Sequence, residues 1–205
     1  MESIISYITE NPMQILGTVI GVIYLIQEIK ASNWMWLSSI IMPVISLFVY
    51  FKAGLYADFG IDIYYVIIAI YGFWAWKWGG KAGKGGQAEL PITKTPSKAW
   101  PYIAAACVVI FFAIRWILVS FTDSSVPNAD SFTTTLSIVA MVMLSRKWIE
   151  QWWFWAVVDA ASTCLYIYKG IYGYAGLYAV YTVLAFYGYA RWAKKMAQAE
   201  TKKVA

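Results

Sequence analysis

The feature that most constrains this chain is a succession of seven long apolar stretches separated by short polar breaks. A helix that crosses a bilayer needs about 20 mostly apolar residues. The stretches lie at about residues 12–29, 34–51, 61–78, 99–119, 133–145, 152–168 and 175–193, and only the fifth is markedly short. The pattern predicts an all-α membrane protein with seven transmembrane helices.

The composition supports a membrane class and argues against an enzyme. Of the 205 residues, 61% are hydrophobic and 13% charged, with a mean hydropathy of +0.59, whereas soluble domains carry about 25% charged residues. Cys107 and Cys164 lie inside apolar stretches, so no disulfide framework is indicated. The absence of histidine removes the commonest metal ligand and general base. We expect no metal, no cofactor and no catalytic residue.

The distribution of positive charge predicts the orientation. All but three of the 16 Lys and Arg residues fall in the breaks after stretches one, three and five or in the C-terminal tail. The exceptions are Lys52, Arg115 and Lys169. Because short basic loops stay in the cytoplasm, we expect the C-terminus inside, the N-terminus outside and the protein in the bacterial cytoplasmic (inner) membrane.

A comparison of the chain with itself reveals a repeat at an offset of 116 residues. The corresponding pairs are Lys30 and Arg146, Trp36 and Trp152, Tyr65 and Tyr181, and the runs Tyr71-Gly72-Phe73 with Trp76 and Tyr187-Gly188-Tyr189 with Trp192. A shared belt of interfacial aromatic residues explains only part of this agreement. A unit of three spans ends on the opposite side of the membrane from where it began. Two such units can therefore have the same orientation only if a single helix lies between them.

The sequence therefore predicts a 3+1+3 arrangement of parallel three-helix repeats, with the substrate held between them as in many carriers. The expected segments are a first repeat at 12–78, a cytoplasmic basic linker at 79–98, a connector helix at 99–120, a second repeat at 132–193 and a cytoplasmic tail at 194–205.

Ionisable residues inside spans are candidates for a functional site. Trp152, Trp155 and Asp159 share one helix face, as do Asp62 and Tyr65. Two indole rings followed by a carboxylate suit a flat organic cation. Other interpretations stay open: Trp152 as a belt residue, Asp62 in the outer headgroup region and Asp159 in a structural role. The repeat adds two candidates by correspondence, Trp36 and Tyr181.

Two long segments carry a resemblance to a known family. The stretch TLSIVAMVMLSRKWIEQWWFWAVVD, the following YKGIYGYAGLYAVYTVLAFYGYARW and the matching first repeat resemble the PnuC family of nicotinamide riboside transporters. The resemblance covers about residues 12–195, and its most specific element is the pair Trp152 and Trp155. It implies a SWEET-like fold, facilitated diffusion, a homotrimer, and a cytoplasmic kinase that traps the vitamin by phosphorylation.

The resemblance leaves two substrates open. The family default is nicotinamide riboside, the NAD precursor, and we place it first. Members of the family tend to carry neutral amides where this chain has Asp62 and Asp159, and these acids suit thiamine, which has a thiazolium cation. We expect an aromatic cation as substrate, lipid as surroundings and no nucleic acid partner. A retinal protein is excluded, because the last span has no lysine between Ala175 and Arg191.

Overall fold

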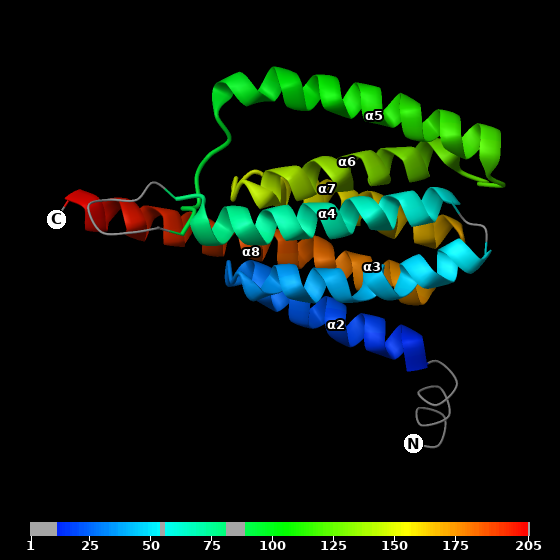
Figure 1. Cartoon of the computed structure of the whole chain (residues 1–205), viewed down its shortest axis with the longest axis horizontal. Coiled ribbons are helices and arrows are strands. Elements are labelled where there is room, and N and C mark those ends of the chain that lie inside the picture. Colours follow the sequence, from blue (N-terminus) through cyan, green and yellow to red (C-terminus); the bar gives the residue numbers. More distant parts are fainter. Residues whose placement is uncertain (1–11, 54–55, 81–88, 205) are drawn as a thin grey trace. The chain divides into compact units, whose positions relative to one another are not determined.

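The structure is a computed structural model that describes residues 12–53, 56–80 and 89–204. Within these residues it contains seven α-helices, one short 3-10 helix and no β-strand, so the predicted all-α class is confirmed (Figure 1). The α-helices are α2 (Pro12–Ile29), α3 (Trp34–Ala53), α4 (Tyr56–Trp78), α5 (Trp100–Phe121), α6 (Pro127–Ser145), α7 (Gln151–Tyr168) and α8 (Tyr172–Val204), and the 3-10 helix is η1 (Ser97–Ala99).

The helix bounds follow the apolar stretches with two notable differences. Helix α6 begins at Pro127, six residues before the predicted span at 133. Proline favours the first turn of a helix, because its missing N–H would have no partner there. Helix α8 is 33 residues long and continues to Val204. The range 194–205, expected as a tail, is therefore helical almost to its end.

The chain divides into two compact units, residues 1–74 and 75–205. The division falls inside α4 and not in the expected linker at 79–98. The reason is Trp76, whose indole N–H donates to the carbonyl of Leu144 at 2.9 Å and whose ring meets the ring of Trp192 edge-on at 5.9 Å. In the first unit α2 packs against α3; in the second, α5 contacts α6, α6 contacts α7, and α7 contacts α8 (Figure 1).

Length and apolar composition alone mark two stretches of the described residues as able to cross a membrane, Phe59–Trp78 and Ser97–Phe121. Val19–Ile29 and Trp34–Phe48 are shorter apolar helices. The other described helices include polar residues that lower their hydropathy, and several of these are buried: Ser131, Thr135, Gln151, Asp159 and Ser162.

The turn between α2 and α3 and the turn between α6 and α7 have matching backbone conformations 116 residues apart. Ala31 and Lys147 occupy the left-handed region, with φ of 50° and 53°. The Ala31 amide donates to the Glu28 carbonyl at 2.8 Å, and the Lys147 amide donates to the Leu144 carbonyl at 2.9 Å. The correspondence found in the sequence thus extends to backbone geometry inside each unit.

The same offset relates two tryptophan–glycine contacts. Trp36 packs against Gly72 in the first unit, and Trp152 packs against Gly188 in the second. A Cβ added to Gly188 would lie 2.5 Å from two carbons of the Trp152 ring, closer than real Cβ contacts allow. Glycine is therefore required at this contact for close approach to the ring, and both tryptophans are almost fully buried.

The described end of the expected linker is attached to the α6–α7 turn. Thr93 forms an isolated parallel bridge with Trp148, because its amide donates to the Lys147 carbonyl at 3.1 Å and its carbonyl accepts from the Ile149 amide at 2.9 Å. The amide and the hydroxyl of Thr95 both donate to Oε2 of Glu150 at 2.7 Å. Residues 81–88, the rest of this linker, lie outside the described residues.

Candidate functional site

The candidate site is built on one face of α7. Gln151, Trp155 and Asp159 are four residues apart, so successive side chains lie above one another, about 6 Å apart along the helix axis. Gln151 and Asp159 are buried and Trp155 is half-buried. The face combines an amide, an indole and a carboxylate, three groups that can bind an aromatic ligand with polar ends.

Two tyrosines from α8 lie near the carboxylate end of this face. Asp159 lies within electrostatic range of Tyr178 and Tyr181. The Tyr178 ring stacks on that of Tyr166 with centroids 5.2 Å apart, and it meets the Tyr181 ring edge-on at 5.8 Å. The structure therefore brings together two predicted residues, Asp159 and Tyr181, and adds Tyr166 and Tyr178 to their surroundings.

Trp152 lies at the edge of this face, three residues before Trp155 and seven before Asp159, and has extensive packing contacts of its own. Its ring presses on Gly188 and meets the Trp192 ring edge-on at 5.7 Å. These contacts hold α7 against α8, so Trp152 contributes to the fold of the second unit. Its predicted contact with a ligand stays a prediction.

The remaining predicted residues belong to the first unit. Trp36 is fully buried in α3 against Gly72. Asp62 and Tyr65 share a face of α4 and lie within electrostatic range of each other, and the Tyr64 ring lies 5.5 Å from the Tyr65 ring. Because α4 begins at Tyr56, Asp62 stands in the second turn of the helix and not at its start.

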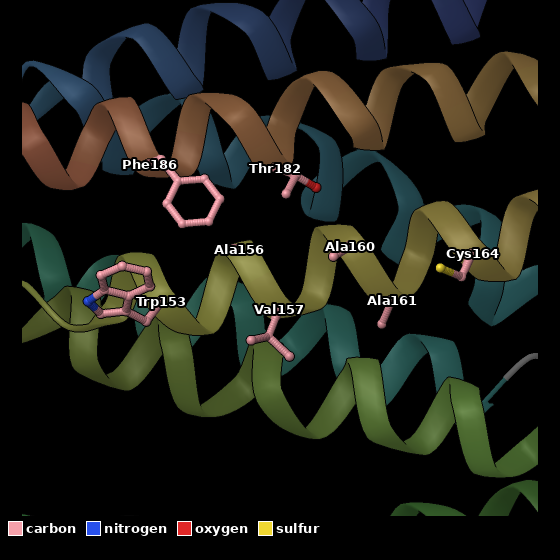
Figure 2. Close-up of a pocket in the computed structure, with 8 residues that line it drawn as sticks. All are labelled: Trp153, Ala156, Val157, Ala160, Ala161, Cys164, Thr182 and Phe186. Carbon is pink, nitrogen blue, oxygen red and sulfur yellow. The ribbon is translucent and has the colours of Figure 1, made fainter.

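An apolar pocket of the second unit does not coincide with this site. An apolar groove of about 600 Å³ lies on another side of α7, facing α8 (Figure 2). Its lining residues are Trp153, Ala156, Val157, Ala160, Ala161, Cys164, Thr182 and Phe186. Thr182 supplies its one hydroxyl, which donates to the Tyr178 carbonyl at 2.9 Å. The groove contains none of the seven predicted site residues, and its lining has no charged side chain.

The turn that precedes α7 contains a buried cation. The ammonium of Lys147 lies 4.3 Å from the centroid of the Trp76 ring, and the residue is 5% exposed. Burial lowers the pKa of Lys147 to about 8, with nearby Lys195 acting in the same direction and Glu89 against it. Lys147 and Glu150 are both attached to neighbouring segments, Lys147 to Trp76 and Glu150 to Thr95.

Gln151 is the site residue that the sequence interpretation missed. It is fully buried, and neither its Oε1 nor its Nε2 has a hydrogen-bond partner. The spacing that related Trp155 to Asp159 extends by one turn to Gln151 and could have revealed it. Within the described residues no group of three His, Cys, Asp or Glu side chains is placed to hold a metal ion.

Comparisons with known proteins identify the family. The family model described as "Nicotinamide mononucleotide transporter" matches residues 11–194, most of the chain. The chain belongs to this family, the PnuC family of vitamin transporters. This match confirms the resemblance seen in the sequence. The family is one of transporters and not of enzymes.

Individual PnuC relatives differ in the vitamin that they are named for. The nicotinamide riboside transporter PnuC of Escherichia coli (strain K12) is 25% identical over 88% of this chain and 84% of its own length. The riboflavin/roseoflavin transporter RibM of Streptomyces davaonensis is 26% identical over 86% of this chain and 82% of its own. A crystal structure of the vitamin B3 transporter PnuC shares the fold, with a TM-score of 0.68 at 23% identity, covering 94% of this chain and 86% of the other.

Proposed function

We propose that this PnuC family member mediates facilitated diffusion of nicotinamide riboside into the cell across the cytoplasmic membrane. The observation that carries the proposal is the α7 face, where the buried Asp159 carboxylate follows the Trp155 indole by one helical turn. Relatives named for nicotinamide riboside, among them the Escherichia coli protein, support this substrate.

The chemistry of the face suits the two parts of nicotinamide riboside. Its pyridinium ring is a flat cation, which gains from stacking on an indole or phenol face. The ribose carries hydroxyl donors, and an ionised carboxylate only accepts hydrogen bonds. Asp159 is therefore able to accept from the ribose hydroxyls while its charge offsets that of the ring. The candidates Trp36, Asp62, Tyr65, Trp152 and Tyr181 complete the proposed set of ligand contacts.

The same proposal includes the 3+1+3 arrangement with α5 as connector. Support comes from the matched turns at Ala31 and Lys147 and from the matched contacts of Trp36 and Trp152, each 116 residues apart. We further propose an outside N-terminus, a cytoplasmic C-terminus, a homotrimer and capture of the imported vitamin by a cytoplasmic kinase. The basic breaks support the orientation, and the family resemblance supports the trimer and the kinase.

Uptake into proteoliposomes tests the substrate. Vesicles containing the purified protein are expected to accumulate labelled nicotinamide riboside to the external concentration, with saturation and without an ion gradient. Empty vesicles are the control. Thiamine and riboflavin are measured in the same way, because the family includes a protein named for riboflavin. If neither the riboside nor a competing vitamin accumulates above the control, the proposal is contradicted.

Thiamine is the second candidate, and the buried Asp159 carboxylate is the observation that favours it. Its thiazolium cation and aminopyrimidine donors both suit an acid. Asp159→Asn removes the charge but keeps the shape, so it is expected to weaken thiamine binding more than riboside binding. If the ratio of the two dissociation constants is unchanged, the carboxylate does not select between these ligands.

A further inference from the structure

The amide of Gln151 has no explanation in the fold alone. The side chain is 0% exposed at the start of α7, and both of its polar atoms lack a hydrogen-bond partner. Buried amides in proteins are nearly always bonded, because an unsatisfied donor or acceptor has lost its water without compensation. A residue that retains this cost at a buried position calls for a partner outside the fold.

Met35 shows what packing requires at the same position of the first unit. It precedes Gln151 by 116 residues and is also 0% exposed. The Met35 amide donates to the Ser32 carbonyl at 3.2 Å, and the Gln151 amide donates to the Trp148 carbonyl at 3.2 Å, so the local backbone is the same. Methionine and glutamine are unbranched side chains of similar length. Methionine therefore fills such a position without any unpaired polar atom.

The difference between the units continues along α7 from Gln151 to Trp155 and Asp159. Gln151, Trp155 and Asp159 correspond to Met35, Ser39 and Pro43 at the offset of 116. In contrast, the tryptophan–glycine contact uses the same residues in both units: Trp36 with Gly72 in the first and Trp152 with Gly188 in the second. Identical residues thus maintain the fold, and the differing residues lie on the face that carries the candidate site.

A second unpaired group on this face points to a polar ligand. The indole Nε1 of Trp155 is buried and has no hydrogen-bond partner. Gln151 precedes Trp155 by four residues and Asp159 by eight, which corresponds to about 12 Å along the helix axis. This span suits a ligand made of a ring and a sugar with polar groups at both ends.

We propose that Gln151 is a specificity-determining residue, whose side-chain amide pairs with the carboxamide of a nicotinamide ring while Asp159 accepts from the ribose hydroxyls. The inference rests on the proposed function. A carboxamide is the natural complement of the glutamine amide, because each group donates one N–H to the carbonyl oxygen of the other. The side chains that enclose Gln151 move aside when the ring enters, as a carrier that alternates between conformations requires.

Calorimetric titration of the purified full-length protein with two ligands tests the pairing. The ligands are nicotinamide riboside and N-ribosylpyridinium, which lacks only the carboxamide. Gln151→Met is expected to weaken riboside binding by about tenfold or more and to change ribosylpyridinium binding by no more than about twofold. Its melting temperature without ligand is expected to equal or exceed that of the wild type, because an unpaired buried amide is removed.

The controls separate this role from packing. Met35→Leu alters the corresponding packing position and is expected to leave the preference between the two ligands unchanged. Gln151→Leu serves as a second variant if Gln151→Met fails to fold. Equal losses for both ligands, or no loss, overturn the role of Gln151 while the proposed function stands. If the wild type binds no nicotinamide riboside, the proposed function and this inference fail together.

Discussion

Gly188 and Trp152 illustrate how closely single residues are matched in this protein. The tryptophan is one of the largest fully packed side chains of the second unit, and it lies directly over the glycine backbone. Neither residue alone predicts this contact. The YGY run that contains Gly188 is typical of an aromatic belt, and Trp152 is typical of a residue at the membrane boundary. Their contact explains why a tryptophan and a glycine recur together at the same offset in both units.

Gly188→Ala is expected to destabilise the protein by about 1–3 kcal/mol, because the added methyl group overlaps the Trp152 ring. The measurement is thermal unfolding in detergent. Gly176→Ala in the same helix is the matched control, because a Cβ there meets nothing within 4 Å. Equal effects of the two substitutions would show that the close approach to Trp152 does not limit stability.

Lys147 gives a pH dependence whose direction follows from its burial. Its folded pKa of about 8 lies below the ordinary value of 10.5, so the unfolded chain binds this proton more tightly. The cost of the buried charge is complete below pH 8 and disappears as the pH rises toward 10.5. Stability relative to Lys147→Met is therefore expected to increase in that window, by at most about 1.4 kcal/mol per pH unit.

Unfolding temperatures of the two proteins from pH 7 to 10 measure this difference. The contact of the ammonium with the Trp76 ring favours the charged form and reduces the slope. A difference that falls with rising pH would mean that this contact outweighs burial.

At the scale of single residues, the sequence predicted which side chains share the candidate face better than it predicted which of them are buried. Helical spacing was enough to place Trp155 and Asp159 on one face. It could not show that Gln151 is enclosed, because a glutamine beside Glu150 at a helix start is usually solvated. Burial there depends on neighbours from other helices, which periodicity does not specify.

Among the elements, the connection between α4 and α5 departs most from expectation. A segment rich in Gly, Lys and Pro reads as an extra-membrane linker, yet its described end at Thr93 and Thr95 is attached to the α6–α7 turn. The helices themselves were predictable, since apolar length and turn residues are local signals. The pairing of Thr93 with Trp148 joins segments 55 residues apart and has no local signal.

Thr95→Val tests this attachment. The valine keeps the shape and the backbone bond to Glu150 but loses the hydroxyl donor, so a loss of about 1–2 kcal/mol is expected for a bond to a carboxylate. Thr95→Ser retains the hydroxyl and is the matched control. Thermal unfolding and proteolysis of the linker both report the effect. If valine and serine behave alike, the side-chain bond does not hold the segment.

For the whole molecule, sequence patterns predicted the all-α class and the family, whereas the orientation and the trimer are proposals. Seven helices and membership of PnuC followed from apolar stretches and from specific aromatic runs. The division into two units could not be predicted from the sequence. It depends on where Trp76 packs and not on which segment is rich in glycine and proline. Orientation and trimer formation depend on the membrane and on other copies of the chain, which one folded chain does not contain.

Orientation is the prediction that belongs to this scale. In a background without Cys107 and Cys164, Ser125→Cys is expected to react with a membrane-impermeant maleimide in intact cells. Lys94→Cys is expected to react only after permeabilisation, because the proposed orientation places the basic linker in the cytoplasm. Both positions are exposed in the structure. Labelling of Lys94→Cys alone in intact cells would reverse the proposed topology.

The position of Trp76 also bears on how such a gene could be divided. The last turn of α4 is encoded with the first three helices, but its indole is packed against the carbonyl of Leu144 and the ring of Trp192. A half-length gene that began after Trp78 would produce a second unit lacking this tryptophan. Fission into two independent half-size subunits would therefore need a new residue to fill that position, which favours the fused, single-chain form.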